Sequence, residues 1–297
     1  MTNLIDPKTD FAFRKLFANN TERSKRMLLS LINAYLAKEP KITVIKEINV
    51  INPYNTGEFE PDKESILDIK AIDENGHWYN IEMQASADPE YFKRALFYWA
   101  KVYTNQLSKG EKYSKLKKTI GIHFLDFYSI ESYRPDYHHT FNLANFKNPK
   151  LVPFGIDLLE IHLIELPKFK REYSPFNVVE EEWTQFFADI KKLSKETNQI
   201  KTPEVKEALS DLDKLNLKGI DRECYEASLR RMAEKNTLIE QAENRGIKAG
   251  EKKGREEGEK KLKEEKLAIA KTLKSQGLTP SQIAAATGIT KGEIEKL

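Results

Sequence analysis

Residues 65–84 read SILDIKAIDENGHWYNIEMQ, and this stretch decides the fold. Apolar and polar residues alternate along its first half and again along its second half, and a turn signal, DENG at residues 73–76, separates the two. A period of two on both sides of a tight turn predicts a β-hairpin. If the turn centres on Asn75, then Asp68 lies opposite Glu82, with Cβ atoms roughly 4.5–5.5 Å apart. The hairpin therefore brings two carboxylates together.

Two carboxylates at that separation repel each other unless a positive charge lies between them. A hard divalent cation such as Mg²⁺ prefers oxygen ligands of this kind. Gln84 follows Glu82 by two residues, so both are expected on one face of the strand. Asp68, Glu82 and Gln84 are therefore the candidate site, where a metal ion could polarise a phosphoryl oxygen and lower the pKa of a water molecule. The alternative is a solvent-facing pair of polar residues, which spacing alone does not exclude.

Composition narrows the classes of protein. The chain has 297 residues and a net charge of +3, from 49 Lys and Arg against 46 Asp and Glu. This length can bury a full core and leaves room for a second small unit. The near balance of charge excludes a strongly polybasic protein but not a local basic groove. A single cysteine, Cys224, excludes an internal disulfide framework and a cysteine-rich zinc site.

The sequence shows no motif typical of a leader peptide, a membrane span or a nucleotide-binding loop. The N-terminal residues contain no apolar leader, and no apolar run reaches the roughly 18 residues of a membrane span. A G-x4-G-K-[ST] phosphate loop is also absent, which argues against a nucleotide cofactor. We therefore expect a cytoplasmic protein that is not bound to a membrane.

The residues around the hairpin predict helices and strands in the order α, β, β, β, α, β, which is an α/β fold. The strand at 119–127 is almost continuously apolar, so it should be buried on both faces. The predicted elements are a helix in two pieces from Thr9 or Asp10 to Leu36, a strand at 41–52, a loop at 53–63, the hairpin, a helix from 88 or 89 to Leu107, strands at 119–127, 137–143 and 156–166, and helices from Val178 onward.

Glycine recurs at every fourth residue near the C-terminus, at Gly246, Gly250, Gly254 and Gly258. Residues 246–266 otherwise mix eight Lys and Arg with six Glu. Spacing of four places the glycines on one stripe of a helix, although each costs a helix about 1 kcal/mol relative to alanine. The pattern leaves open a solvated charged helix, a helix that packs against another chain, and a flexible arm.

The last part of the chain predicts three short helices, in LAIAKTLKSQG, LTPSQIAAATG and ITKGEIEKL. Gly277 and Gly288 are the expected stops and Thr279 the expected N-cap. The spacing is similar to a helix-turn-helix unit. Few basic residues lie on its third helix, so DNA reading by this unit stays open as an alternative but is not favoured.

The order of elements around the hairpin, with D…E-x-Q on its two strands, resembles the PD-(D/E)XK nuclease superfamily. More closely, the chain is similar to the Rpn family of recombination-promoting nucleases, transposases of the PD-(D/E)XK type. The stretches that carry the resemblance span most of residues 6–190: TDFAFRKLF (9–17), SILDIKAID (65–73), YNIEMQ (79–84), FKRALFYWAKVYTNQLSKGEKY (92–113), TIGIHFLDF (119–127) and IHLIELPKF (161–169).

The resemblance implies a fold and a division of the chain. The core would be restriction-endonuclease-like, with αβββαβ order and a mixed sheet flanked by helices, in a nuclease-like domain at 1–195. A helical connector would follow at 196–245. A Gly-punctuated charged helix and the small helix-turn-helix-like tail would form residues 246–297, as an α-helical C-terminal extension.

The resemblance also implies an activity: a Mg²⁺-dependent DNA endonuclease that promotes recombination, with Mn²⁺ or Ca²⁺ as alternative ions. Asp68 and Glu82 would be metal ligands, and Gln84 would occupy the position of the superfamily lysine. This is a departure, because lysine places a positive charge near the attacking water whereas glutamine can only hydrogen-bond it. The family shares this glutamine variant.

Four residues are candidate accessory groups. Lys70 is expected on the same strand face as Asp68, and Arg94 with Tyr98 forms an i, i+4 pair on the following helix. Asp10 on the first helix is a further acid. The alternative for Arg94 is an ion pair at the edge of the core, and the alternative for Asp10 is a first-turn acid favoured by the helix dipole.

Other polar motifs are weaker candidates. Pro61 and Asp62 spell the superfamily's "PD", but they fall in a loop and not in an apolar strand, so we prefer Asp68. His138 and His139 are adjacent, so on a strand they point to opposite faces and cannot chelate one ion. The remaining histidines are isolated in the sequence and are expected in the core or on the surface: His77, His123 and His162.

Two rival functions remain open at this point. One is a DNA-binding or protein-interaction protein that keeps the fold without catalysis. The other is an assembly scaffold dominated by the C-terminal tail. A homodimer held by the C-terminal helix would fit the nuclease interpretation, because cutting both strands of a duplex needs two active sites.

Overall fold

A computed structural model of the chain describes residues 4–36, 44–51, 68–130, 135–143, 157–170, 176, 178–213 and 217–297. The chain forms two compact units, Met1–Asn236 and Thr237–Leu297. The predicted loop at 53–63, with Pro61 and Asp62, and the start of the hairpin stretch at 65–67 lie outside the described residues.

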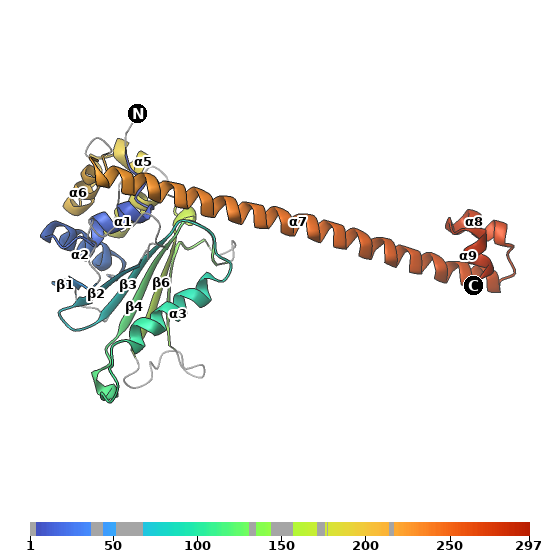
Figure 1. The fold of residues 1–297 in the computed structure, drawn as a ribbon, viewed down its shortest axis with the longest axis horizontal. Helices are drawn as coiled ribbons and strands as arrows, with labels where there is room; N and C mark the ends of the chain where they lie inside the picture. Colours follow the sequence, from blue (N-terminus) through green and yellow to red (C-terminus); the bar gives the residue numbers. More distant parts are fainter. Residues whose placement is uncertain are drawn as a thin grey trace. The chain divides into compact units, whose positions relative to one another are not determined.

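A six-stranded mixed sheet forms the centre of the first unit (Figure 1). The strand order is β1-β2-β3-β4-β6-β5. The first three strands pair antiparallel, β3, β4 and β6 are parallel neighbours, and β5 is antiparallel to β6. The predicted α/β fold with a mixed sheet is confirmed. The strands are β1 (Ile48–Val50), β2 (Asp68–Asp73), β3 (Trp78–Gln84), β4 (Thr119–Leu125), β5 (His138–Asn142) and β6 (Leu159–Glu165).

Helices cover both faces of this sheet (Figure 1). The larger core lies on one face and the smaller core lies under α3 on the other. The break predicted in the first helical stretch is present, because α1 ends at Phe17 and α2 begins at Glu22. The helices are α1 (Asp10–Phe17), α2 (Glu22–Leu36), α4 (Val179–Ala188), α5 (Ile190–Lys195) and α6 (Pro203–Asp211) with the larger core, and α3 (Tyr91–Thr104) with the smaller; short 3-10 turns are η2 (Tyr113–Lys115) and η3 (Leu166–Lys168).

The hairpin forms in the predicted register, with Asp68 opposite Glu82 and Lys70 opposite Asn80. The carboxylate of Asp73 organises its turn by accepting the backbone N–H groups of residues 75 and 77, each at 2.8 Å. Gly76 completes the turn with φ of +81°, a backbone conformation that other residues rarely adopt. The residue types of the turn therefore explain the pairing of β2 with β3.

The strand predicted at 41–52 is shorter than expected, because β1 contains only Ile48–Val50. Side chains from other parts of the chain form hydrogen bonds with the backbone N–H and C=O groups just before this strand. Asn33 bonds both the N–H and the carbonyl of Ile45, each at 2.9 Å. The carboxylate of Glu74 accepts the N–H groups of residues 46 and 47 at 3.0 and 3.2 Å. Groups bonded in this way cannot join a strand ladder. Residues 41–43 lie outside the described part of the chain.

A single helix, α7 (Ile220–Ser275, 56 residues), begins in the first unit and ends in the second. It runs through all four regularly spaced glycines, and its end contains the first of the three predicted tail helices, so the prediction of a separate helix there was wrong. The residues between the glycines are strong helix formers, and pairs such as Lys252–Glu256, at 3.9 Å, support the helix.

The second unit closes with two short helices, α8 (Pro280–Thr287) and α9 (Lys291–Glu295). Both begin with a capping box, and Gly277 and Gly288 stop the preceding helices with φ of +85° and +72°. Ile283 and Ile294 pack against Ala270 at the end of α7 and form a small core. None of the helices among the described residues combines the length and the apolar character needed to cross a bilayer.

Candidate active site

Strand β3 directs alternate side chains to opposite faces of the sheet. Ile81 and Met83 belong to the larger core, whereas Asn80, Glu82 and Gln84 alternate with them. All five side chains are buried. A polar row on a central strand is costly unless its atoms are bonded, so the partners of Glu82 define the site.

Three neighbours hold the carboxylate of Glu82. Its Oε1 accepts the Asn80 amide at 2.9 Å, and its Oε2 accepts the hydroxyl of Tyr91, the first residue of α3, at 3.1 Å. The Gln84 amide donates to Oε2 at 3.5 Å, the limit for a hydrogen bond. The imidazole Nδ1 of His123, on β4, lies 3.8 Å from the same oxygen. The site therefore joins β3, β4 and α3.

The direction of these bonds follows from the chemistry of the groups. A carboxylate can only accept, so the single hydroxyl hydrogen of Tyr91 is directed to Glu82. The Tyr91 oxygen lies 2.8 Å from Nδ1 of His123 and must then accept a hydrogen from it. His123 therefore has its hydrogen on Nδ1. The result is a donor chain that runs from His123 through Tyr91 to Glu82.

This environment keeps Glu82 ionised. Burial alone would raise its pKa, but the imidazole of His123, the Asn80 amide and the Tyr91 hydroxyl outweigh burial and lower the pKa to about 2. Burial and the adjacent carboxylate raise the pKa of Tyr91 well above its ordinary value. The tyrosine thus remains a protonated donor at neutral pH, where Glu82 is negative.

Gly121 makes room for the His123 ring. A Cβ atom at this position would lie 2.6 Å from His123 Nε2, closer than real contacts allow. His123 is buried, in agreement with one of the two predicted alternatives, and the parallel register of β3 and β4 places it beside Glu82, a contact that the sequence did not predict. One signal could have suggested it: His123 is the only imidazole in the apolar run at 119–127.

Oxygen atoms without hydrogen-bond partners flank Glu82. Among the described residues, the side-chain oxygens of Asn80 and Gln84 are buried and accept no hydrogen bond. Glu82 itself accepts three hydrogen bonds, and a carboxylate offers about four acceptor positions. The oxygen atoms of Glu82 and Gln84 are of the kind that a hard cation prefers. Within the same described part of the chain, no cluster of three or more His, Cys, Asp or Glu forms a metal site.

The structure places three of the other predicted residues around this centre. Asp68 is the Cα partner of Glu82, and Lys70 is the partner of Asn80. The Arg94 guanidinium lies over the Tyr98 ring, 5.6 Å from its centroid, and its Nη1 is 3.4 Å from Asp88 Oδ2. Burial alone would lower the pKa of Arg94, but the charge of Glu82, together with Tyr98 and the bond to Asp88, raises the pKa above its ordinary value, so Arg94 is a cation in the field of Glu82.

Asp10 lies in a different set of contacts. Its Oδ2 is 3.7 Å from Arg231 Nη2 on α7, and the described partners of Glu82 do not include it. Burial raises the pKa of Asp10 to about 6, although the charges of Arg14 and Arg231 oppose this shift. Thr9 caps α1 just before it and accepts the Ala12 N–H. Asp10 therefore resembles the first-turn acid of the alternative prediction.

The other histidines lie away from Glu82. His138 and His139 point to opposite faces, as predicted: His138 meets His162 at 2.9 Å, whereas His139 lies 3.5 Å from Glu165. His162 is buried, in agreement with one of the two predicted alternatives, and it also bonds Glu160 at 2.6 Å. These contacts belong to the first unit and share no residue with the partners of Glu82.

Comparison with known proteins identifies a family for most of the chain. A family model described as PD-(D/E)XK nuclease family transposase matches residues 7–242. This range contains the sheet, the partners of Glu82 and the first part of α7. Comparisons with curated proteins and with solved structures gave no match.

Proposed function

Because this chain belongs to the PD-(D/E)XK nuclease family transposases, we propose that it is a metal-dependent DNA endonuclease that promotes recombination. One observation carries the proposal: an ionised, buried Glu82 lies opposite Asp68 in the hairpin register, beside the unbonded oxygen of Gln84. Acid and amide oxygens in this arrangement suit a hard cation and a phosphodiester substrate.

Asp68 and Glu82 would hold the ion, with the oxygen of Gln84 next to it. A bound Mg²⁺ supplies stabilisation of phosphoryl charge and lowers the pKa of a water molecule. Glu82 suits this role because its pKa of about 2 keeps it negative at neutral pH. The limiting 3.5 Å bond from Gln84 is the contact most easily exchanged for a metal ion.

The remaining groups would orient the reactants. The Gln84 oxygen can accept a hydrogen from the attacking water and so fix its direction. Glutamine supplies no charge, and Arg94 is the nearby cation that can pair with a phosphate. Tyr91 and His123 position the Glu82 carboxylate through their donor chain. Positive charge would therefore come from Arg94 on α3 and from Lys70 on β2, the partner of Asn80, and not from the position of the superfamily lysine.

A non-catalytic DNA-binding protein is the second candidate, and one observation favours it. Glu82 is already satisfied by internal donors, as a purely structural buried carboxylate would be. In that case the fold would be retained while cleavage was lost. The two candidates differ in whether DNA is cut once it is bound.

A homodimer through α7 would supply two active sites for cutting both strands. A Cβ atom added at any of the four regularly spaced glycines would meet no atom of the described residues within 4 Å, apart from the helix's own backbone. That stripe therefore leaves room for close approach by another helix. Ile247, on the next position to Gly246, is also exposed. A partner helix would offset the helix cost of the glycines.

Cleavage of supercoiled plasmid by the purified full chain tests the proposed function. Nicked and linear products should form with Mg²⁺ or Mn²⁺ and not with EDTA. Asp68→Ala and Glu82→Ala should abolish them, whereas Glu207→Ala on the surface of α6 should not. Equal cleavage by all variants would overturn the assignment, and a DNA mobility shift without cleavage under any metal would favour the non-catalytic candidate.

A further inference from the structure

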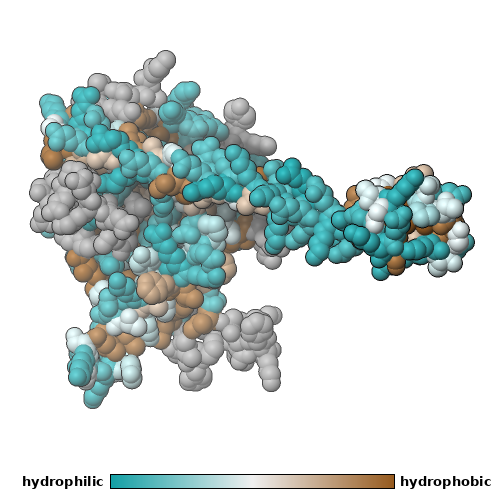
Figure 2. All heavy atoms as spheres, turned by 45° about the vertical axis from the view of Figure 1, so that its right-hand side comes forward, coloured by the Kyte–Doolittle hydropathy of each residue, from teal (hydrophilic) through white to brown (hydrophobic). Residues whose placement is uncertain are grey.

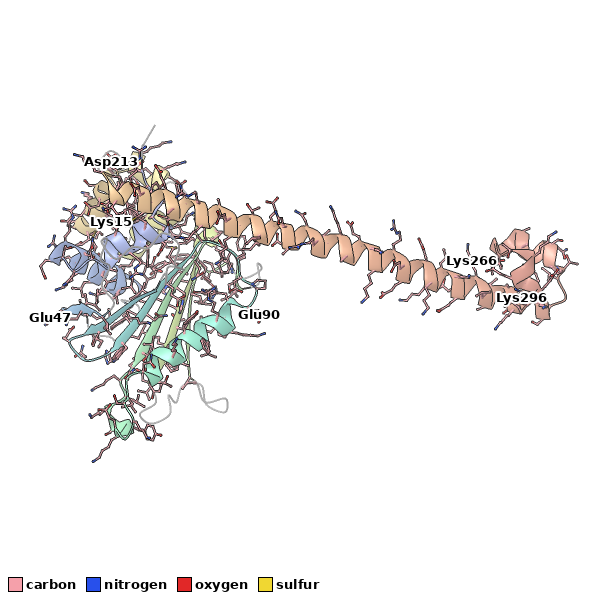
Figure 3. The ribbon with its side chains drawn as sticks, viewed as in Figure 1. Lys15, Glu47, Glu90, Asp213, Lys266 and Lys296 are labelled. Carbon is pink, nitrogen blue, oxygen red and sulfur yellow. The ribbon has the colours of Figure 1, made fainter. Side chains whose placement is uncertain are left out.

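Positive charge is concentrated in one segment of the chain, at residues 91–118. This segment contains eight Lys and Arg and a single Glu, whereas the whole chain has a net charge of only +3. It comprises α3, η2 and the connections up to β4. Glu90, labelled in Figure 3, marks the start of α3. The remaining residues of the chain are therefore negative in sum, and the basic surface is local.

Large aromatic side chains are exposed within the same segment. Phe97 is 65% exposed and Tyr113 is 83% exposed. Lys93, Phe97 and Lys101 follow one another at spacings of four, so Phe97 lies between two lysines on one stripe of α3. The Lys93 ammonium pairs with Glu90. Figure 2 shows hydrophobic surface mixed with hydrophilic surface at the height of α3 in the first unit. Exposed aromatic rings between cations indicate a binding surface.

This surface begins at the site. Tyr91, on the first turn of α3, bonds Glu82, and Arg94 lies in its field. Neighbouring rings support the exposed ones: Phe97 contacts Tyr98 with ring centroids 5.6 Å apart. Arg94 lies on α3 between the buried side of the helix and the exposed side that carries Phe97, so a nucleic-acid strand bound along the exposed side would pass close to the cation that lies in the field of Glu82.

We propose that α3 and η2 bind an unpaired, single-stranded part of the nucleic-acid substrate. Bases stack on Phe97 and Tyr113, and phosphates contact Lys101 and Lys112. A duplex would satisfy the lysines but would leave the rings unused, because paired bases hide their faces. An acidic protein partner would explain the positive charge of this surface but not the aromatic rings between the lysines. The inference rests on the proposed function, since it specifies the substrate of the same site.

Binding measured in EDTA separates this inference from catalysis. The probe is a fluorescein-labelled 20-nucleotide single strand, compared with the same sequence as a blunt duplex, and the readout is fluorescence anisotropy with the full chain. We expect the single strand to bind more tightly. Phe97→Ala and Tyr113→Ala should each weaken single-strand binding about tenfold and change duplex binding less than about twofold. Val44→Ala, at a site 66% exposed outside this surface, is the matched apolar control.

Salt dependence tests the lysines in the same way. Lys101→Gln combined with Lys112→Gln should reduce the slope of log K against log salt by about 1.4 for the single strand. Lys191→Gln with Lys206→Gln, exposed on α5 and α6, should leave the slope unchanged.

Three results would overturn the inference. The first is single-strand binding that the ring variants do not change, and the second is equal loss of duplex binding. The third is a change in oligomeric mass by light scattering in the ring variants, which would make this face a contact between copies of the chain. Plasmid cleavage that persists alongside any of these results would leave the proposed function standing.

Discussion

Replacing Tyr91 with phenylalanine removes one oxygen from the centre of the donor chain. That hydroxyl donates to Glu82 at 3.1 Å and accepts from His123 at 2.8 Å. The substitution takes a donor from a buried carboxylate and leaves the His123 N–H buried without an acceptor. A hydrogen bond to a charged group contributes about 1.5–3 kcal/mol, and a stranded buried donor costs about 1–3 kcal/mol. We expect Tyr91→Phe to lower the free energy of unfolding by about 3 kcal/mol.

A double-mutant cycle isolates the part of this destabilisation that depends on the direction of the hydrogen bonds. His123→Leu removes the donor that Tyr91→Phe strands, so the double variant should be less destabilised than the sum of the two single variants. The expected coupling is about 1–3 kcal/mol. If His123 and Tyr91 acted independently, the effects would add within about 0.5 kcal/mol.

Urea unfolding in EDTA, followed by tryptophan fluorescence, measures the free energy of unfolding of the wild type and of each variant in the cycle. The three tryptophans of the chain, Trp78, Trp99 and Trp183, all lie in the first unit, so the signal does not report on the second unit. Additive effects would refute the proposed chain from His123 through Tyr91 to Glu82.

Other substitutions test separate parts of the account. Gly121→Ala should destabilise the first unit by about 1–3 kcal/mol in the same assay, because its Cβ would lie 2.6 Å from His123 Nε2. An unchanged free energy of unfolding would contradict the packing argument. Asp10 has a pKa raised from 3.8 to about 6, so the folded state binds its proton more tightly and stability should fall by up to about 3 kcal/mol between pH 4 and 7. Asp10→Asn should flatten this part of the pH profile, and an unchanged profile would rule out Asp10 as its source. Truncation after Asn244 should yield a monomer by light scattering if α7 holds a dimer, and an unchanged number of chains per particle would refute that role.

Local sequence was sufficient for the hairpin. Alternation, the DENG turn and Gly76 specify the pairing, and the register of Asp68 with Glu82 agrees with the structure. Helix N-caps were also predictable from the sequence, since Thr9 and Thr279 lie at helix starts where their side chains can bond backbone N–H groups. Each of these features depends on residues that are close in sequence.

Features that depend on distant residues were not predictable in the same way. His123 joins Glu82 only because β4 pairs parallel with β3, and the segment between them gives no register signal. Strand β1 is short because Asn33 and Glu74, both outside it, bind the backbone before it. The glycines of α7 indicated a weak helix, but the residues between them sustain it.

Metal binding in the absence of DNA tests the central claim most directly. The free-ion electron paramagnetic resonance signal of Mn²⁺ is followed as full-length protein is added. We predict one site per chain, weakened at least about tenfold by Asp68→Asn and by Glu82→Gln and unchanged by Glu207→Gln. Tryptophan fluorescence establishes that each variant is folded. Mn²⁺ binding that neither of the first two substitutions weakens would contradict a metal site at the hairpin.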